Sequence, residues 1–155
     1  MADVHLMNVF DGARQTWAAA GAAVTSVIPV SRVYFHRLPE GVVYPACTIT
    51  VKDVSAYFGG TTYFSGARYV KVQQITFTIY CLPTTDLSSL LTALADALGW
   101  SSTDPNGVWI IPNAVGVLSA MPETDTPELL NERIDGQDII KWPTTYTITL
   151  ECDRG

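Results

Sequence analysis

The side chains that could do chemistry in this chain are few. There are two histidines, His5 and His36, and three cysteines, Cys47, Cys81 and Cys152. A catalytic thiolate needs a base beside it, so His36 and Cys81 are the pair to weigh. Each cysteine falls on the apolar face of a strand-like stretch, where a thiol usually serves as a small core residue. We therefore favour a structural role for all three cysteines over a nucleophile.

Motifs for metals and phosphates do not occur in the sequence. No pair of histidines or cysteines has the spacing of metal ligands. Glu123, Asp125 and Glu128 lack the glycine and the terminal glutamate of a calcium loop. Gly59-Gly60 has aromatic flanks instead of a GxxxxGK[ST] or GxGxxG pattern, which favours a turn over a phosphate loop. We predict that the protein is not an enzyme and has no cofactor and no metal.

The composition is that of an acidic globular protein with few charges. The 155 residues are 48% hydrophobic and 15% charged, and the net charge is −6. A chain of this length is most simply one domain, residues 1–155, with a core large enough to hold it together. The basic residues are scattered, so we expect no sequence-specific nucleic-acid binding. An acidic wall can still line a conduit through which DNA slides without adhering.

The same composition argues against export and against a membrane span. An odd number of cysteines, no CxxC spacing and a start without basic residues favour folding in a reducing cytoplasm. The longest uncharged run, residues 15–31, is broken by Gly21 and Pro29 and falls short of the roughly 20 apolar residues that a bilayer needs. We predict no membrane partner.

Hydrophobic periodicity predicts the elements that must position these side chains. Apolar residues at helical spacing predict one helix over 6–27, and a leucine-rich face predicts another from Leu87 to Leu98. We expect loops over 55–67 and 122–144, both mobile, with one helical turn within 128–135 and a tight turn at Asp135-Gly136. The predicted strands cover 33–37, 47–51, 69–81, 108–111, 115–121 and 145–152.

This order of elements predicts the fold class. Helix, strands, helix and strands in separate runs indicate an α+β fold. We expect a mainly antiparallel sheet with the N-terminal helix and the leucine-rich helix packed on one face. The threonine-rich opposite face then either meets solvent or meets a neighbouring molecule.

The longest predicted strand, Tyr69–Cys81, changes its apolar phase in the middle. Val70 and Val72 share one face, whereas the apolar residues from Ile75 to Cys81 share the opposite face. Either a β-bulge at Gln73-Gln74 resets the phase, or the two halves bury against different bodies. The second alternative indicates a subunit that gives part of its sheet to a neighbour.

Four aromatic residues surround the glycine pair that precedes this strand. They either pack across a hairpin or anchor in a pocket of a partner, since aromatic residues are enriched at the centres of interfaces. With the first half of the long strand, they form our candidate subunit or partner interface. Its residues are Tyr57, Phe58, Tyr63, Phe64, Tyr69, Val70 and Val72.

Three blocks of the chain carry a resemblance to a known family. They are an aromatic-Pro pair that leads into a strand (Tyr44–Val51), a strand that runs through Leu-Pro into the leucine helix (Val72–Pro83, then Asp86), and the final strand (Tyr146–Glu151). In this pattern the chain resembles the tail terminator proteins of long-tailed bacteriophages, also called tail completion or tail-to-head joining proteins. The resemblance covers about half of the chain and includes no catalytic signature.

The resemblance implies a function. Proteins of this family form a hexameric ring on the finished tail tube, stop its growth and offer a surface to the head. The implied partners are further copies of the chain, the major tail tube protein and a head-completion or neck protein. The implied location is the head-proximal end of the virion tail, after assembly in the host cytoplasm. In such a ring we expect residues 69–73 to reach the adjacent subunit while 75–81 stay in the core.

Two other function classes stay open. One is a head-completion, neck or other minor tail protein, which should bind isolated heads rather than isolated tubes. The other is a small enzyme, which requires His36 or Cys81 to be exposed in a cleft.

Overall fold

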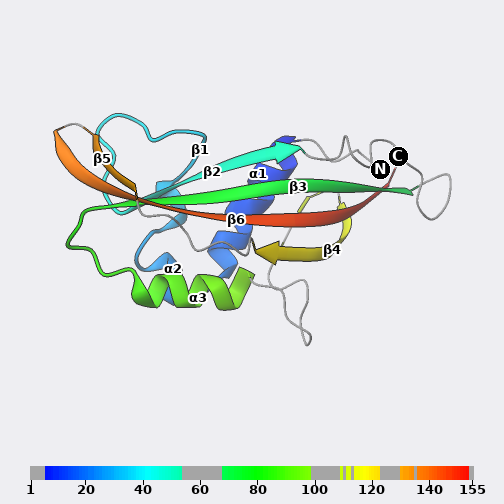
Figure 1. The fold of residues 1–155 in the computed structure, drawn as a ribbon. Coiled ribbons are helices and arrows are strands. Elements are labelled where there is room, and N and C mark those ends of the chain that lie inside the picture. Colours follow the sequence, from blue (N-terminus) through cyan, green and yellow to red (C-terminus); the bar gives the residue numbers. More distant parts are fainter. Residues whose placement is uncertain are drawn as a thin grey trace.

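The computed structural model describes residues 6–53, 68–98, 109, 111–112, 114–122, 130–134 and 136–153. Over these residues the fold is α+β, as the sequence predicts, with a long curled sheet and helices gathered on one of its faces (Figure 1). The predicted loop 55–67 lies outside the described residues.

The N-terminal helical region is two helices rather than the single predicted helix. Helix α1 spans Leu6–Ala19 and α2 spans Ala22–Thr25. Gly21 between them has a φ of 107°, a conformation that interrupts a right-handed helix and that glycine adopts without steric cost. A 3₁₀ turn at Val30–Arg32 then leads into the sheet.

The described sheet has six strands in the order β1-β2-β3-β6-β4, and β5 pairs with β6 off this path. The pair β1 and β2 is parallel, and the other described pairs are antiparallel. The predicted central strands are thus confirmed. The strands are β1 (Val33–Phe35), β2 (Ala46–Asp53), β3 (Arg68–Cys81), β4 (Ala114–Pro122), β5 (Leu130–Ile134) and β6 (Gln137–Asp153).

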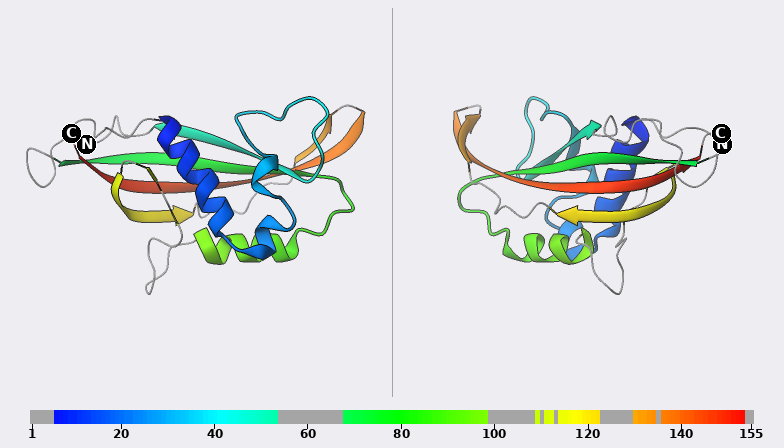
Figure 2. Two further views of the ribbon diagram at one scale, coloured as in Figure 1. Left: turned by 180° about the vertical axis from the view of Figure 1, so that it is seen from behind. Right: turned by 45° about the vertical axis from the view of Figure 1, so that its right-hand side comes forward.

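The core lies between the sheet and the helices, and aromatic rings occupy its middle. Helix α1 crosses one face of the sheet, in front of it in Figure 2 (left) and behind it in Figure 1. The ring of Phe77 on β3 is fully buried, with its centroid 5.5 Å from that of Trp17, 6.1 Å from Trp109 and 6.2 Å from Tyr146. The Trp17 indole N–H donates a hydrogen bond of 2.9 Å to the carbonyl of Ile28, so the ring is buried without losing its polar contact.

Helix α3 (Ser88–Leu98) confirms the leucine-rich helix. Its inward face packs on the same core through leucines three or four residues apart, the spacing of one helical face. Leu87, Leu90, Leu94 and Leu98 are all buried. Asp86 precedes the helix, and its carboxylate Oδ1 accepts hydrogen bonds from the Ser88 backbone N–H at 3.0 Å and the Ser88 hydroxyl at 2.7 Å.

Substitution of Asp86 should weaken the start of α3 in a pH-dependent way. The two hydrogen bonds from Ser88 hold the pKa of the Asp86 carboxyl below its usual value of 3.8. A depressed pKa contributes stability above 3.8, which is lost as the pH falls through the folded-state pKa. We expect Asp86→Ala to have a lower melting temperature than the wild type at pH 7, and the gap to shrink in strong acid. Thermal scans across pH test this, and a gap that is constant with pH would contradict it.

The segment 122–144 contains more strand than the sequence indicates. We predicted a long exposed loop with a helical turn in 128–135, and this is wrong where the structure is described, because β5 occupies 130–134 and β6 begins at Gln137. The turn at Gly136 is confirmed, with a φ of 77°. The strand predicted over 33–37 ends early at Phe35, and Trp109 and Ile111 of the strand predicted over 108–111 are not in a strand.

The phase change in β3 has a definite structural origin. The register of β3 is unbroken against both β2 and β6, so the bulge interpretation is wrong. The two apolar sets lie on opposite faces, because Gln73 takes a core-face position in line with Ile75 while Val72 faces the other way. Gln73 is fully buried, and within the described structure neither its Oε1 nor its Nε2 has a hydrogen-bond partner.

Replacement of Gln73 by methionine should therefore stabilise the subunit. The side chains are similar in length, and the change removes two buried polar atoms whose desolvation is not compensated. We expect a gain of about 1–2 kcal/mol in the free energy of unfolding, measured by denaturant titration. Gln74→Met, at the adjacent half-buried position on the other face, should change it by less than about 0.5 kcal/mol. A destabilised Gln73→Met variant would show that the amide is satisfied in solution.

Candidate assembly surface

The structure separates the two residues weighed for catalysis. The backbone N–H of His36 donates to the Ile49 carbonyl at 3.0 Å, and Ile49 pairs with Phe77 on β3. Cys81 lies four residues further along β3, with β2 between that strand and β1. At about 3.4 Å per residue and about 4.8 Å per strand, the two residues are roughly 17 Å apart. His36 and Cys81 therefore do not form a thiolate pair.

The described thiols are placed as core groups. Cys47, Cys81 and Cys152 are free cysteines, and all three are buried. Burial raises the pKa of the Cys47 thiol and of the Cys81 thiol above their ordinary value, which favours the unreactive protonated form. His36, predicted inside a strand, instead follows β1 with a left-handed φ of 68° and stacks on Phe35 with ring centroids 4.0 Å apart.

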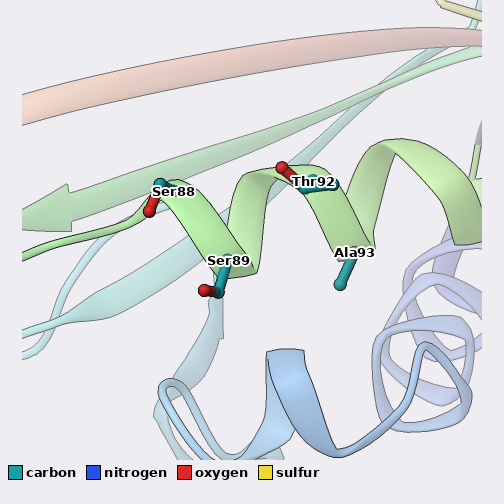
Figure 3. A pocket seen from close by; sticks show the side chains of 4 residues that line it. All are labelled: Ser88, Ser89, Thr92 and Ala93. Atoms are coloured by element: carbon teal, nitrogen blue, oxygen red, sulfur yellow. The ribbon is translucent and has the colours of Figure 1, made fainter.

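The described concavities are shallow. One of about 410 Å³ lies along α3, and Figure 3 shows that Ser89 and Ala93, two of its lining residues, point away from the sheet. Another of about 380 Å³ lies beside α1. Within the described ranges, no group of three His, Cys, Asp or Glu side chains could hold a metal ion. The first depression is lined by Ser88, Ser89, Thr92 and Ala93, and the second by Asp11, Arg14, Gln15, Ala18, Val30 and Pro112.

The other candidate surface is the sheet face opposite the helices, which we call the threonine face, although Ala46, Thr48 and Val72 on it are buried. Alternation along the strands puts the even-numbered residues of β2 and β3 and the odd-numbered residues of β6 on this face. In its central row Thr50 pairs with Thr76, which pairs with Thr145, and the hydroxyls of Thr76 and Thr145 lie 2.9 Å apart. These three side chains are half-buried. The central row of this face is β-branched and uncharged.

Both ends of the sheet present strands that run past their neighbours. At one end the last described residue of β2, Asp53, pairs with Gln73, and the described pairing of β3 with β6 extends further, to Arg68 and Asp153. At the other end β6 runs past Cys81, the last residue of β3, and pairs only with β5 in the described structure. Figure 1 shows this β5–β6 hairpin at the left end of the sheet and the start of β3 at the right end.

The predicted interface residues fall unevenly on this surface. Tyr57, Phe58, Tyr63 and Phe64 lie outside the described residues. Tyr69 and Val70 belong to β3, and only their backbone is described. Val72 lies on the threonine face and is buried within the subunit, with only 8% of its surface exposed. The Val72 side chain is therefore not available for a contact at this end of β3.

Sequence reasoning missed the hairpin at the opposite end. Leu130, Ile134, Ile139 and Ile140 flank the Asp135-Gly136 turn, and this arrangement is typical of a hairpin. Three prolines and several charges in the surrounding segment favoured a loop instead. The turn pattern thus indicated a hairpin, but the prolines and charges indicated a loop more strongly.

Comparisons with known proteins identify the fold. No protein-family model and no curated protein matches the sequence. Nine chains of solved structures match the fold, and one is a chain of the virion of a native gene transfer agent particle. That match has a TM-score of 0.55 at 11% identity, and it covers 92% of this chain and 97% of that one. Among the described residues, no helix is long and apolar enough to cross a bilayer.

Proposed function

We propose that this chain is a structural subunit of a phage virion, which forms a ring on the head-proximal end of the tail tube. The ring stops tube growth and provides the surface to which the head is joined. The observation that carries this proposal is the fold shared with a virion chain over 92% of the present sequence. It agrees with the family resemblance of the Tyr44–Val51, Val72–Pro83 and Tyr146–Glu151 blocks.

The surface supports assembly better than it supports catalysis. A sheet face that the helices do not cover is suited to contacts with other subunits. Subunits in a ring meet through unlike patches, and the two ends of this sheet are unlike. The described thiols, by contrast, are buried. The proposed partners are copies of the same chain, the major tail tube protein and a head-completion or neck protein.

The proposal is tested with polymerising tail tubes. Purified tube protein of the phage that encodes this chain is allowed to polymerise with and without the purified chain, and tube lengths are measured by negative-stain electron microscopy. We expect tubes with a bounded length and a capped end when the chain is present. Tubes of unlimited length with bare ends would refute the proposal. Binding to isolated heads but not to tubes would instead identify a head-completion or neck protein.

A further inference from the structure

The β5–β6 hairpin presents two opposite charges at one end of the sheet (Figure 1). Arg133 and Asp138 are opposite each other in the register of the hairpin, and they form an ion pair of 3.5 Å while their side chains stay 73% and 78% exposed. Ile140 packs against the core, so Asp138, two residues before it, lies on the helix side of β6. An exposed ion pair contributes little to stability, so these two charges can exchange partners at small cost.

A groove beside α1, which we call the α1 groove, holds the matching pair of charges. It has a volume of about 380 Å³, and its lining includes Asp11 and Arg14 with the apolar Val30 and Pro112. Arg14 is half-buried, and its Nη2 donates to the Val30 carbonyl at 3.1 Å, which fixes the guanidinium beside the groove. Asp11 is exposed, and across the described ranges neither of these two charges belongs to an ion pair. Both are therefore available to a partner.

The two pairs of charges have the same spacing. Residues three apart on a helix, as Asp11 and Arg14 are, have Cβ atoms about 5–6 Å apart. Residues directly opposite each other in an antiparallel pair have Cβ atoms about 4.5–5.5 Å apart. A hairpin in the α1 groove can therefore form two ion pairs together, Asp138 with Arg14 and Arg133 with Asp11. The reversed placement sets like charges against each other, so the charges also fix the direction of the hairpin.

We propose that the β5–β6 hairpin of one subunit docks in the α1 groove of the next copy. This rests on the proposed ring function and specifies the contact that builds the ring. Within one subunit the hairpin lies at one end of the sheet while α1 crosses its middle, so the contact joins different copies (Figure 2). Hairpin and groove are unlike patches, and contacts between unlike patches close into rings when the rotation between copies permits.

A charge exchange tests this contact through its energetics. The yield is the fraction of tube ends that carry a ring in electron micrographs. Asp138→Arg and Arg14→Asp should each lower it at least about tenfold at low salt, and the two together should restore it. The exchange of Asp11→Arg with Arg133→Asp repeats the test without disturbing the hydrogen bond to Val30. Lys52→Asp, at an exposed position of β2, should leave the yield unchanged, and melting temperatures confirm that each variant folds.

A cysteine pair tests the same contact through its geometry. Gln15 lines the groove, and both it and Gln137, next to Asp138, are exposed. The chain with Gln15→Cys and Gln137→Cys is assembled on tube ends and treated with a short bismaleimide. Because the three native cysteines are buried, they should not react in the folded protein. We expect a ladder of covalent oligomers up to the size of the ring on a denaturing gel.

Matched variants show whether the cross-link is specific. Each single-cysteine variant should stay monomeric. The pair of Gln15→Cys with Met121→Cys, which uses the exposed Met121 of β4, should stay monomeric too.

The outcomes separate this contact from the ring function itself. Rings seen by microscopy that give neither cross-links nor charge rescue would overturn the contact and leave the ring function standing. Bare tube ends with the wild-type chain would overturn the ring function, and the contact with it.

Discussion

Phe77→Ala is expected to lower the free energy of unfolding by about 3–5 kcal/mol, the usual cost of removing a fully buried aromatic ring. The ring is fully buried and packs near Trp17, Trp109 and Tyr146, so its loss leaves a cavity between the sheet and α1. This is a large share of the 5–15 kcal/mol that holds a typical domain together. Denaturant titration followed by tryptophan fluorescence measures it.

A matched control on the same strand tests whether the core lies on the helix-covered face of the sheet. Tyr80 is on the same strand but on the threonine face, half-buried, with the Lys141 ammonium 5.5 Å from its ring centroid. Tyr80→Ala should cost no more than about 1.5 kcal/mol. If both variants lost the same stability, the assignment of the helix-covered face as the core would be wrong.

Val72→Asp is expected to unfold or strongly destabilise the isolated subunit. Val72 is 8% exposed, and a carboxylate there must be either desolvated or protonated, which costs about 3 kcal/mol or more. The melting temperature of the purified chain should therefore fall, and ring assembly should fail as a consequence. Circular dichroism across a temperature ramp makes the measurement.

The neighbouring position provides the comparison for Val72. Gln74 lies on the same face two residues further along β3 and is half-buried, so Gln74→Asp should lower the melting temperature far less. A Val72→Asp subunit with wild-type melting and no ring assembly would contradict the burial of Val72 within one subunit. It would place that side chain in the interface instead.

Local patterns predicted the elements that have strong periodicity. The leucines of α3 and the alternation in β2 and in the second half of β3 were sufficient to identify them, because each buries one continuous face. Elsewhere a single residue made the observed element differ from the predicted one. Gly21 divides the predicted first helix, because its φ of 107° interrupts the helical backbone, which hydrophobic spacing does not reveal.

Long-range pairing decided what the local signals could not. Residues 137–144 include Lys141 and Pro143, which favour a loop, yet they belong to β6, because β5 pairs with 137–141 and β3 pairs from Ile140 onward. The phase change at Gln73 indicated correctly that the two apolar sets lie on opposite faces of β3. It could not indicate that the β5–β6 hairpin projects at the opposite end, since that depends on which strands are neighbours.

The most direct test of the assembly account is electron cryo-microscopy of tube ends formed in the presence of the wild-type chain. The account predicts a closed ring of identical copies on one end of each tube. Single, unconnected copies along the tube wall, or tube ends that carry no extra density, would contradict it.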